Sequence, residues 1–316
     1  MPTPAARLRD SMSRARAAGT SLAIPGAFNA LCARAISQHG FEACYISGAA
    51  TSVSAGVPDV GLLTLDHFAR CIREAADASN LPVLADADTG FGEAEMVRRT
   101  VIEYARAGAA GLHLEDQKFP KRCGHLDGKE LVPLDHMVEK IEWAAKAASS
   151  PSLPPGERAG EGLANDTRPS IIICARTDAR GVEGFDAAVA RARAYVNAGA
   201  EMIFPEGLTT EDEFAKFAQA LRSVTPSLRH SPLLLANMTE FGKTTIIPLQ
   251  RFGEMGYDCV IYPVSLLRVA MGAVSRALAQ LKSQGSVAPF IDQMQTRKEL
   301  YELIEYAPGK PWEWPV

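Results

Sequence analysis

A short pattern of apolar and polar positions recurs along the chain. A stretch with helical periodicity ends at a glycine, two small or polar residues follow, and an apolar run then begins. The glycines that carry this pattern are Gly40, Gly108, Gly199 and Gly256. A glycine just past a helix end supplies a left-handed cap, and a tight loop then leads into the next strand. The repeat therefore predicts alternating helices and strands.

The same reading along the whole chain gives eight apolar runs that we interpret as strands. They are residues 21–25, 43–46, 82–87, 111–115, 171–175, 202–205, 233–236 and 259–262. Helical stretches separate them, for example 65–78, 93–107, 137–148, 185–198 and 211–221. Eight strand–helix units are typical of a closed parallel barrel, so we expect an α/β fold with a (β/α)8 TIM-type barrel. A doubly wound open sheet is the alternative, but no G-x-G-x-x-G follows the first strand.

The pattern also divides the chain into segments. Residues 1–20 form an N-terminal helical extension, and residues 21–284 form the barrel. Residues 149–169 are rich in Pro, Gly, Ser and Glu and lack periodicity, which indicates a surface insertion. Two helical patterns, 265–284 and 290–305, follow the last strand. Because the second exceeds what a barrel needs, we expect the C-terminal segment 285–316 to pack on a neighbouring subunit.

Composition narrows the class of protein. The 316 residues are 47% hydrophobic and 22% charged, with a formal net charge of −4. That balance gives no basic field for nucleic acid or an anionic membrane, and no apolar run is long enough to span a bilayer. The six cysteines include no C-x-x-C pair, which disfavours a zinc ribbon. We therefore expect a cytoplasmic enzyme without nucleic-acid or membrane partners.

Acidic residues follow two neighbouring predicted strands, at the barrel end where active sites are built. Asp86 and Asp88 lie on one side of their strand because side chains alternate with period two, and Glu115 ends the next strand. Carboxylate oxygens are the ligands that Mg²⁺ prefers, so a divalent metal is the favoured interpretation. The alternative is that these acids cap the following helix or pair with Arg176.

Other strand ends carry groups suited to binding carboxylates. Arg176, Arg268 and Arg297 are candidates because a guanidinium group matches a carboxylate in a bidentate way. Structural ion pairs with acids such as Glu183 or Glu299 are the alternative. Asn237 and Thr239 either donate hydrogen bonds to a carboxylate or cap the helix that follows.

One cysteine has an unusual setting. Cys123 lies in the segment Lys121-Arg122-Cys123-Gly124-His125, shortly after a predicted strand end. Cationic neighbours lower the pKa of a thiol. With His125 beside it, Cys123 fits either a nucleophile or an acid that protonates a carbanion.

Taken together, these segments resemble the isocitrate lyase/phosphoenolpyruvate mutase superfamily, and within it the 2-methylisocitrate lyases. The resemblance covers roughly residues 20 to 306. It is carried by the segments ADADTGFG (85–92), AGAAGLHLEDQ (107–117), KRCGH (121–125), ARTDA (175–179), ANMTEFG (236–242), YPVSLLR (262–268) and MQTRKELYE (294–302).

The resemblance implies a barrel whose final helix is swapped between subunits of a homotetramer. It implies Mg²⁺, with Mn²⁺ as a substitute, bound directly or through water by Asp86 and Asp88 near Asp59 and Glu115. The implied substrate site is Ser47, Gly48, Ala49, Cys123, Gly124, Arg176, Glu206, Asn237, Thr239, Arg268 and Arg297.

The implied reaction is a retro-aldol cleavage of a 2-hydroxy di- or tricarboxylate, as in propionate catabolism. Cys123 then protonates the carbanion, and Tyr45 is the candidate general base. Closure of the 118–129 loop would bring Cys123 in and exclude water.

Two departures from the family pattern bear on the substrate. The chain has Ser47-Gly48-Ala49-Ala50 where methylisocitrate lyases usually have Ser-Gly-Gly-Gly, and Leu126-Asp127-Gly128-Lys129 after the cysteine. A 2,3-dimethylmalate substrate therefore stays open beside 2-methylisocitrate. Pro263 argues against an oxaloacetate hydrolase, and the full set of site residues argues against a catalytically silent binding protein.

Overall fold

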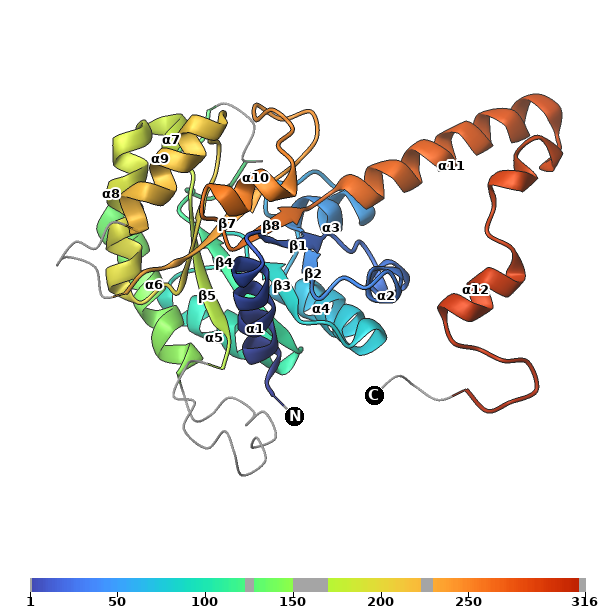
Figure 1. The fold of residues 1–316 in the computed structure, drawn as a ribbon, viewed down its shortest axis with the longest axis horizontal. Helices are drawn as coiled ribbons and strands as arrows, with labels where there is room; N and C mark the ends of the chain where they lie inside the picture. Colours follow the sequence, from blue (N-terminus) through green and yellow to red (C-terminus); the bar gives the residue numbers. More distant parts are fainter. Residues whose placement is uncertain (1, 123–127, 150–169, 223–229, 313–316) are drawn as a thin grey trace.

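The computed structural model describes residues 2–122, 128–149, 170–222 and 230–312. Within these ranges, eight parallel strands form one sheet (Figure 1). They are β1 (Leu22–Pro25), β2 (Cys44–Ile46), β3 (Val83–Asp86), β4 (Ala109–Glu115), β5 (Ile172–Thr177), β6 (Met202–Pro205), β7 (Leu233–Asn237) and β8 (Cys259–Tyr262). These bounds agree with the predicted strands to within two residues at each end.

The sheet closes on itself as a barrel. Each strand from β2 to β8 pairs with its neighbour in sequence, and β1 pairs with β8. The remaining seam is joined by a bridge between Gly26 and Tyr45, where the Ala27 amide donates to the Tyr45 carbonyl at 2.8 Å. The predicted (β/α)8 barrel is therefore confirmed, and the doubly wound alternative is wrong.

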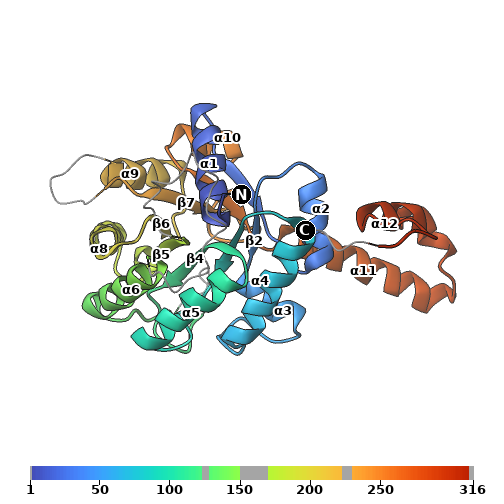
Figure 2. The ribbon, with the colours of Figure 1, turned by 90° about the horizontal axis from the view of Figure 1, so that it is seen from below.

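Helices follow the strands along the chain and surround the barrel (Figures 1 and 2). They are α2 (Ala30–Gln38), α3 (Gly48–Ser54), α4 (Leu65–Ser79), α5 (Ala94–Arg106), α6 (Leu134–Ala148), α7 (Ala179–Val182), α8 (Phe185–Ala198), α9 (Glu211–Arg222), α10 (Leu249–Glu254) and α11 (Ser265–Gln284). The four glycines of the recurring pattern all have positive φ, between 81° and 113°, as the caps require.

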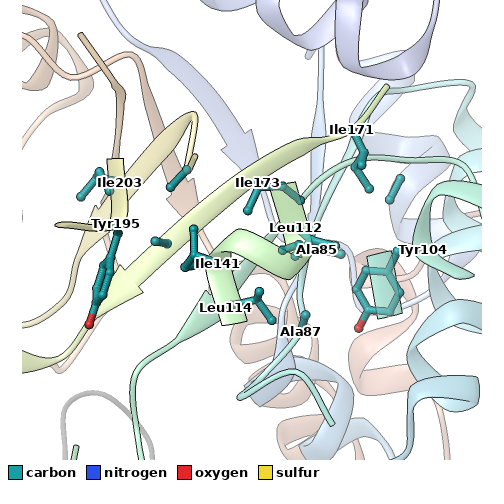
Figure 3. Close-up of a cluster of buried hydrophobic side chains, with 14 of the residues drawn as sticks. Ala85, Ala87, Tyr104, Leu112, Leu114, Ile141, Ile171, Ile173, Tyr195 and Ile203 are labelled. Atoms are coloured by element: carbon teal, nitrogen blue, oxygen red, sulfur yellow. The ribbon is translucent and has the colours of Figure 1, made fainter. Parts of the chain in front are cut away.

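Alternation along the strands separates two hydrophobic layers. Outward side chains of β3 to β6 pack under the helices, where Leu112 and Ile173 lie with Tyr104 of α5, Ile141 of α6 and Tyr195 of α8 (Figure 3). Inward side chains form a second cluster that fills the lower barrel. On several strands the next inward position toward the carboxyl end is polar. The barrel interior therefore changes from apolar to polar toward the carboxyl ends of the strands, where the candidate site lies.

The N-terminal helix covers the end of the barrel formed by the amino ends of the strands. α1 (Pro4–Ala17) buries Leu8 and Met12 in the same cluster as the inward side chains. Arg9 pairs with Glu201, just before β6, at 2.6 Å, and Arg16 pairs with Asp258, just before β8. α1 therefore seals the amino-terminal end, which leaves the carboxyl ends of the strands as the open face.

Helix α11 extends away from the barrel (Figures 1 and 2), whereas α12 returns to α2, where Gln38 Nε2 donates to the Leu303 carbonyl at 3.0 Å. The predicted helix at 265–284 is confirmed as α11, but the pattern at 290–305 is divided into η1 (Ala288–Gln293) and α12 (Arg297–Leu303). The break is explained by a capping box, in which Thr296 and Glu299 bond each other's backbone amides at the start of α12. No helix in the described ranges is both long and apolar enough to cross a membrane.

The predicted insertion at 149–169 lies outside the described residues, apart from Ser149 at the end of α6.

Candidate active site

A cavity of about 140 Å³ opens at the carboxyl ends of the strands; we call it the catalytic cavity. Most of the predicted site residues line it: Tyr45, Ser47, Ala49, Asp59, Asp86, Arg176, Glu206, Asn237, Thr239 and Arg268. The strand alternation explains much of this set. Asp86, Arg176 and Asn237 each lie two residues beyond an inward apolar side chain of their strand. They therefore also point into the barrel, but nearer to its carboxyl end.

Asp86 and Asp88 converge on one backbone position. A Cβ built on Gly48 would lie 2.6 Å from Asp86 Oδ2 and 3.2 Å from Asp88 Oδ1. The Gly48 amide donates to Asp86 Oδ2 at 3.1 Å. β3 ends at Asp86, and Asp88 has a left-handed backbone with φ of 46°, so a turn rather than strand alternation brings the second carboxylate here. The two carboxylates lie together as expected, but a turn brings them together and strand alternation does not.

An ammonium group lies among these acids. Lys121 is buried, and its Nζ lies 2.5 Å from Asp59 Oδ1 and 2.7 Å from Asp88 Oδ1. Burial alone would lower the pKa of Lys121, but the carboxylates of Glu115, Asp86 and Asp88 outweigh it and raise the pKa. Burial and the adjacent Asp86 raise the pKa of Asp88 to about 6. The site therefore holds more negative charge than Lys121 alone balances.

The donor set fits a hard divalent cation. Among the described residues, no three His, Cys, Asp or Glu side chains form a complete metal cage, and the Lys121 ammonium lies between Asp59 and Asp88. Glu115 is nevertheless fully buried, and its Oε1 has no hydrogen-bond partner among them. Burial raises the pKa of Glu115 far above its usual range, partly opposed by Arg176. Carboxylates that gather beside a glycine surface are the oxygen ligands that Mg²⁺ uses.

Arg176 is the centre of a buried ion-pair cluster. Its Nε lies 2.9 Å from Asp178 Oδ2, its Nη1 lies 3.3 Å from Glu115, and its Nη2 lies 3.8 Å from Glu206. The guanidinium carbon is 5.2 Å from the centre of the Phe204 ring. The alternative of a structural ion pair is therefore confirmed, including the pairing with Glu115, although the partner Glu183 is wrong because it pairs with Arg191 at 2.7 Å.

The far side of the cavity is lined by neutral donors. Asn237 Nδ2 donates to Glu206 Oε2 at 3.1 Å, while Asn237 Oδ1 is buried without a hydrogen-bond partner in the described chain. The next helix, α10, begins only at Leu249, so Asn237 and Thr239 do not cap it and that alternative is wrong. Both side chains therefore line the cavity.

The two remaining predicted arginines differ in position. Arg268 lines the cavity, where its Nη1 donates to the Glu240 carbonyl at 2.6 Å and its guanidinium lies 5.1 Å from the Phe241 ring centre. Arg297 begins α12, which contacts α2 on the outside of the barrel, and does not line the catalytic cavity of its own chain. Cys123, Gly124 and His125 lie outside the described residues.

Sequence reasoning missed one inward side chain, His113. It is fully buried, and its Nε2 lies 2.7 Å from the Tyr45 hydroxyl, while its Nδ1 lies 3.6 Å from Asp86 Oδ1. Burial lowers the pKa of His113 to about 4, so the ring is neutral near pH 7. Burial and Asp86 raise the pKa of Tyr45 well above its usual value. The sequence could have predicted that His113 points into the barrel, because it lies two residues before Glu115 on the same strand.

Comparison with known proteins identifies the family. The phosphoenolpyruvate phosphomutase family model matches residues 13–154 and 157–282. The "Probable 2-methylisocitrate lyase 1" of Corynebacterium glutamicum is 48% identical over 300 residues, which are 95% of this chain and 90% of that protein. The chain belongs to the isocitrate lyase/phosphoenolpyruvate mutase superfamily. A second superfamily relative, the 2-methylisocitrate lyase of Bacillus subtilis, is 43% identical over 302 residues, covering 96% of this chain and 89% of its own.

Solved structures of the superfamily share the whole fold. A 2,3-dimethylmalate lyase superimposes with a TM-score of 0.81 at 34% identity, covering 96% of this chain and 92% of that one. A phosphonopyruvate hydrolase, solved with oxalate and Mg²⁺, superimposes with a TM-score of 0.76 at 27% identity, covering 96% and 95%. The metal in that complex is consistent with the carboxylate-rich donor set described above.

Proposed function

We propose that this protein is an Mg²⁺-dependent carbon–carbon lyase that cleaves 2-methylisocitrate to pyruvate and succinate. The observation that carries the proposal is the catalytic cavity, in which Arg176 and Asn237 lie with Asp86, whose carboxylate converges with that of Asp88 at Gly48. That arrangement suits a substrate with a 2-hydroxy carboxylate at one end and further carboxylates at the other. Two relatives at 48% and 43% identity carry the name 2-methylisocitrate lyase.

The cationic and amide groups hold the substrate's carboxylates. Arg176 is preorganised by Asp178, Glu115 and Phe204, so it loses little freedom when it binds an anion. The second Nδ2 proton of Asn237, beyond the one donated to Glu206, and the hydroxyl of Thr239 are available to donate to a carboxylate at the opposite end. Arg268 lies at the edge, where its half-exposed guanidinium meets a carboxylate entering from solvent.

The first proton leaves through Tyr45 in this proposal. Its phenol is protonated, because burial raises its pKa, and it lies within hydrogen-bond distance of the neutral His113 Nε2. Tyr45 passes its proton to His113 Nε2 as it accepts the substrate's hydroxyl proton. The C2–C3 bond then breaks, the C2 oxygen becomes the ketone of pyruvate, and the bonding electrons stay on C3.

The carbanion at C3 is adjacent to a carboxylate and is stabilised as an aci-acid. Cys123 donates its thiol proton to C3, which completes succinate, and Arg122 and His125 lie within two residues of it in sequence. Asp86 and Asp88, with Asp59 and Glu115 nearby, would hold Mg²⁺. The metal, when bound, supplies Lewis-acid stabilisation of the developing negative charge on the C2 oxygen.

A 2,3-dimethylmalate substrate is the second candidate. It is favoured by the structural likeness to a 2,3-dimethylmalate lyase and by Ala49, which adds a methyl group to the cavity wall. Both substrates release a ketoacid by the same bond cleavage, so the roles of Arg176, Tyr45 and Cys123 do not differ between them.

We further propose that the protein is a homotetramer in which α11 and α12 pack on a neighbouring subunit. Met271, Val274, Leu278 and Leu281 recur at three- and four-residue intervals along α11 and are all exposed, with Leu278 at 59%. Such a stripe is the packing face of an amphipathic helix, and the described part of the chain leaves it exposed. The same assembly could bring Arg297 of one subunit to a neighbour's cavity. The five described cysteines are free, which supports a cytoplasmic location.

A substrate panel tests the proposal. The purified protein is assayed with Mg²⁺ on 2-methylisocitrate, 2,3-dimethylmalate, isocitrate and oxaloacetate, and ketoacid release is followed. We expect 2-methylisocitrate to give the highest kcat/KM, and EDTA to abolish the activity until Mg²⁺ is restored. Turnover of 2,3-dimethylmalate alone would keep the chemistry and overturn the substrate. Oxalate and acetate from oxaloacetate would overturn both.

A further inference from the structure

A second cavity lies beside the barrel mouth and is larger than the catalytic cavity. It encloses about 940 Å³ between the α3–α4 loop, the β3–α5 loop and the described segments 117–121 and 130–140. We call it the side cavity. Its volume is in the range of pockets that bind small organic molecules.

The side cavity is separate from the catalytic cavity. The two share no lining residue among those described. Asp59 and Asp86 face the catalytic cavity, while Asp88 and Lys121 face the side cavity. The ion pairs of Lys121 with Asp59 and Asp88 therefore form the wall between them. A ligand in the side cavity would lie outside the reaction space.

Most of the charged groups in the side cavity are already paired. Lys118 lies 3.2 Å from Glu130, and His136 Nε2 lies 2.5 Å from Glu93 Oε2. These pairs are partly exposed at the rim. Asp66 and Arg99 also line the cavity, both at exposed positions where water solvates their charges.

Lys140 is a buried cation of the side cavity whose nearest carboxylate is distant. Its side chain is only 7% exposed, and its Nζ donates to the Thr89 carbonyl at 3.2 Å. The only carboxylate oxygen of the described residues within 4 Å is Glu93 Oε2, at 3.9 Å, and this oxygen bonds His136. An ammonium group has three protons to donate, and a buried charge is costly without an opposite charge. Burial accordingly lowers the pKa of Lys140.

Part of the wall is apolar. Leu63, Phe91, Met96 and Leu131 line the side cavity and pack their far sides against the main hydrophobic core. Phe91 has a left-handed backbone, with φ of 59°, and its ring is held at 5.5 Å from Phe68. Such backbone conformations cost about 1 kcal/mol or more in a non-glycine residue and are concentrated at ligand sites.

We propose that the side cavity binds an amphipathic organic anion, whose acidic group pairs with Lys140 and whose apolar body lies on Leu63, Phe91 and Met96. The anion supplies the charge that Lys140 lacks, and the body covers apolar surface that is otherwise left to water. The site is independent of which 2-hydroxy carboxylate is the substrate.

A matched pair of fluorescent probes tests the proposal on the full-length protein. 1-Anilinonaphthalene-8-sulfonate carries an acidic group, and N-phenyl-1-naphthylamine has the same aromatic body without it. We expect Lys140→Met to weaken binding of the sulfonate about tenfold and to change binding of the neutral probe less than twofold. Lys146→Met is the matched control, since Lys146 is an exposed residue of the same helix outside the cavity. Sulfonate bound elsewhere, for example on α11, is unaffected by either change.

Two further arms locate the probe. Met96→Trp fills the side cavity with Lys140 left in place, so both probes should bind at least about fivefold more weakly; this arm also holds if Lys140→Met fails to fold. Oxalate with Mg²⁺, a ligand for the catalytic cavity, should displace neither probe. Sulfonate binding that survives both substitutions, or that oxalate abolishes, would overturn the proposal.

Discussion

At the scale of single residues, the catalytic cavity depends on charges that are buried together. Arg176 is nearly enclosed, and Asp178, Glu115 and Glu206 surround it. These acids outweigh the effect of burial and raise the pKa of Arg176, so its positive charge is fixed. A buried pair of this kind costs several kcal/mol to break, because the partner is left unpaired. The cluster therefore positions the guanidinium more strictly than a surface arginine.

Replacing Arg176 with lysine should keep the positive charge but remove the planar set of N–H donors of the guanidinium group. We expect kcat/KM to fall by about 10²-fold or more, because an ammonium group cannot hold Asp178 and a substrate carboxylate in the same plane. Arg180→Lys is the matched control, since Arg180 pairs with Glu213 outside the cavity. Steady-state kinetics on both variants decide the point. Equal activity of the two would show that Arg176 is only structural.

Cys123→Ser tests the general acid. A serine hydroxyl is far less acidic than a thiol, so protonation of the carbanion should slow and kcat should fall by about 10²- to 10⁴-fold. Cys71→Ser is the control, because Cys71 lies on α4 outside both cavities. Turnover of Cys123→Ser at the wild-type rate would show that another group protonates the product.

His113 should make the free energy of unfolding depend on pH, and the direction of its pKa shift sets the sign of that dependence. Its pKa is about 4 in the folded protein and 6.5 in the unfolded chain. Between these values the unfolded chain binds the proton first, so stability falls as the pH is lowered from about 6.5 to 4. The loss amounts to at most about 3 kcal/mol.

His113→Gln should flatten this part of the profile, whereas His39→Gln, at an exposed position, should leave it unchanged. Urea unfolding at fixed protein concentration in EDTA measures it. Parallel pH profiles for the wild type and His113→Gln would contradict the assignment.

The sequence predicts the parts of the site that depend on contacts between residues close together in the chain. Asp86, Arg176 and Asn237 were predictable because strand alternation places them at the same end of the barrel. The partners of Lys121 were not, since they lie on other loops and only tertiary packing brings them together. Asp178 was overlooked as the partner of Arg176, although it directly follows β5 and lies only two residues on from the arginine.

At the scale of elements, local signals set most boundaries. The glycine caps and short apolar runs place all eight strands, because each unit depends on contacts within a few residues. The pattern at 290–305 was read as one helix because its apolar spacing continues across the break. The capping box at Thr296 and Glu299 starts a new helix instead. A cap therefore overrides periodicity where the two signals conflict.

The apolar stripe of α11 provides a test at this scale. Val274→Asp combined with Leu278→Asp should place two charges in the proposed subunit interface and lower the mass in solution from a tetramer. Light scattering after size-exclusion chromatography measures it, and Ser283→Asp, at an exposed polar position of the same helix, is the control. An unchanged mass in the double variant would show that α11 is not an interface.

At the scale of the whole molecule, the barrel has one sealed end and one chemically active end. α1 closes the amino-terminal end with Leu8 and Met12, while acids and arginine gather at the other. The architecture follows from the repeat of strand and helix. The 48% identity to a 2-methylisocitrate lyase and the 34% identity to a solved 2,3-dimethylmalate lyase leave the substrate as the point to decide.

The most direct test is a comparison of kcat/KM for 2-methylisocitrate and 2,3-dimethylmalate with the same enzyme preparation in Mg²⁺. Pyruvate from 2-methylisocitrate is followed by coupling to lactate dehydrogenase, and ketoacid from 2,3-dimethylmalate by its hydrazone. We predict that 2-methylisocitrate is favoured at least about tenfold, because its extra carboxylate meets the arginine and amide groups of the cavity. A preference for 2,3-dimethylmalate, or no pyruvate from 2-methylisocitrate, would contradict the account.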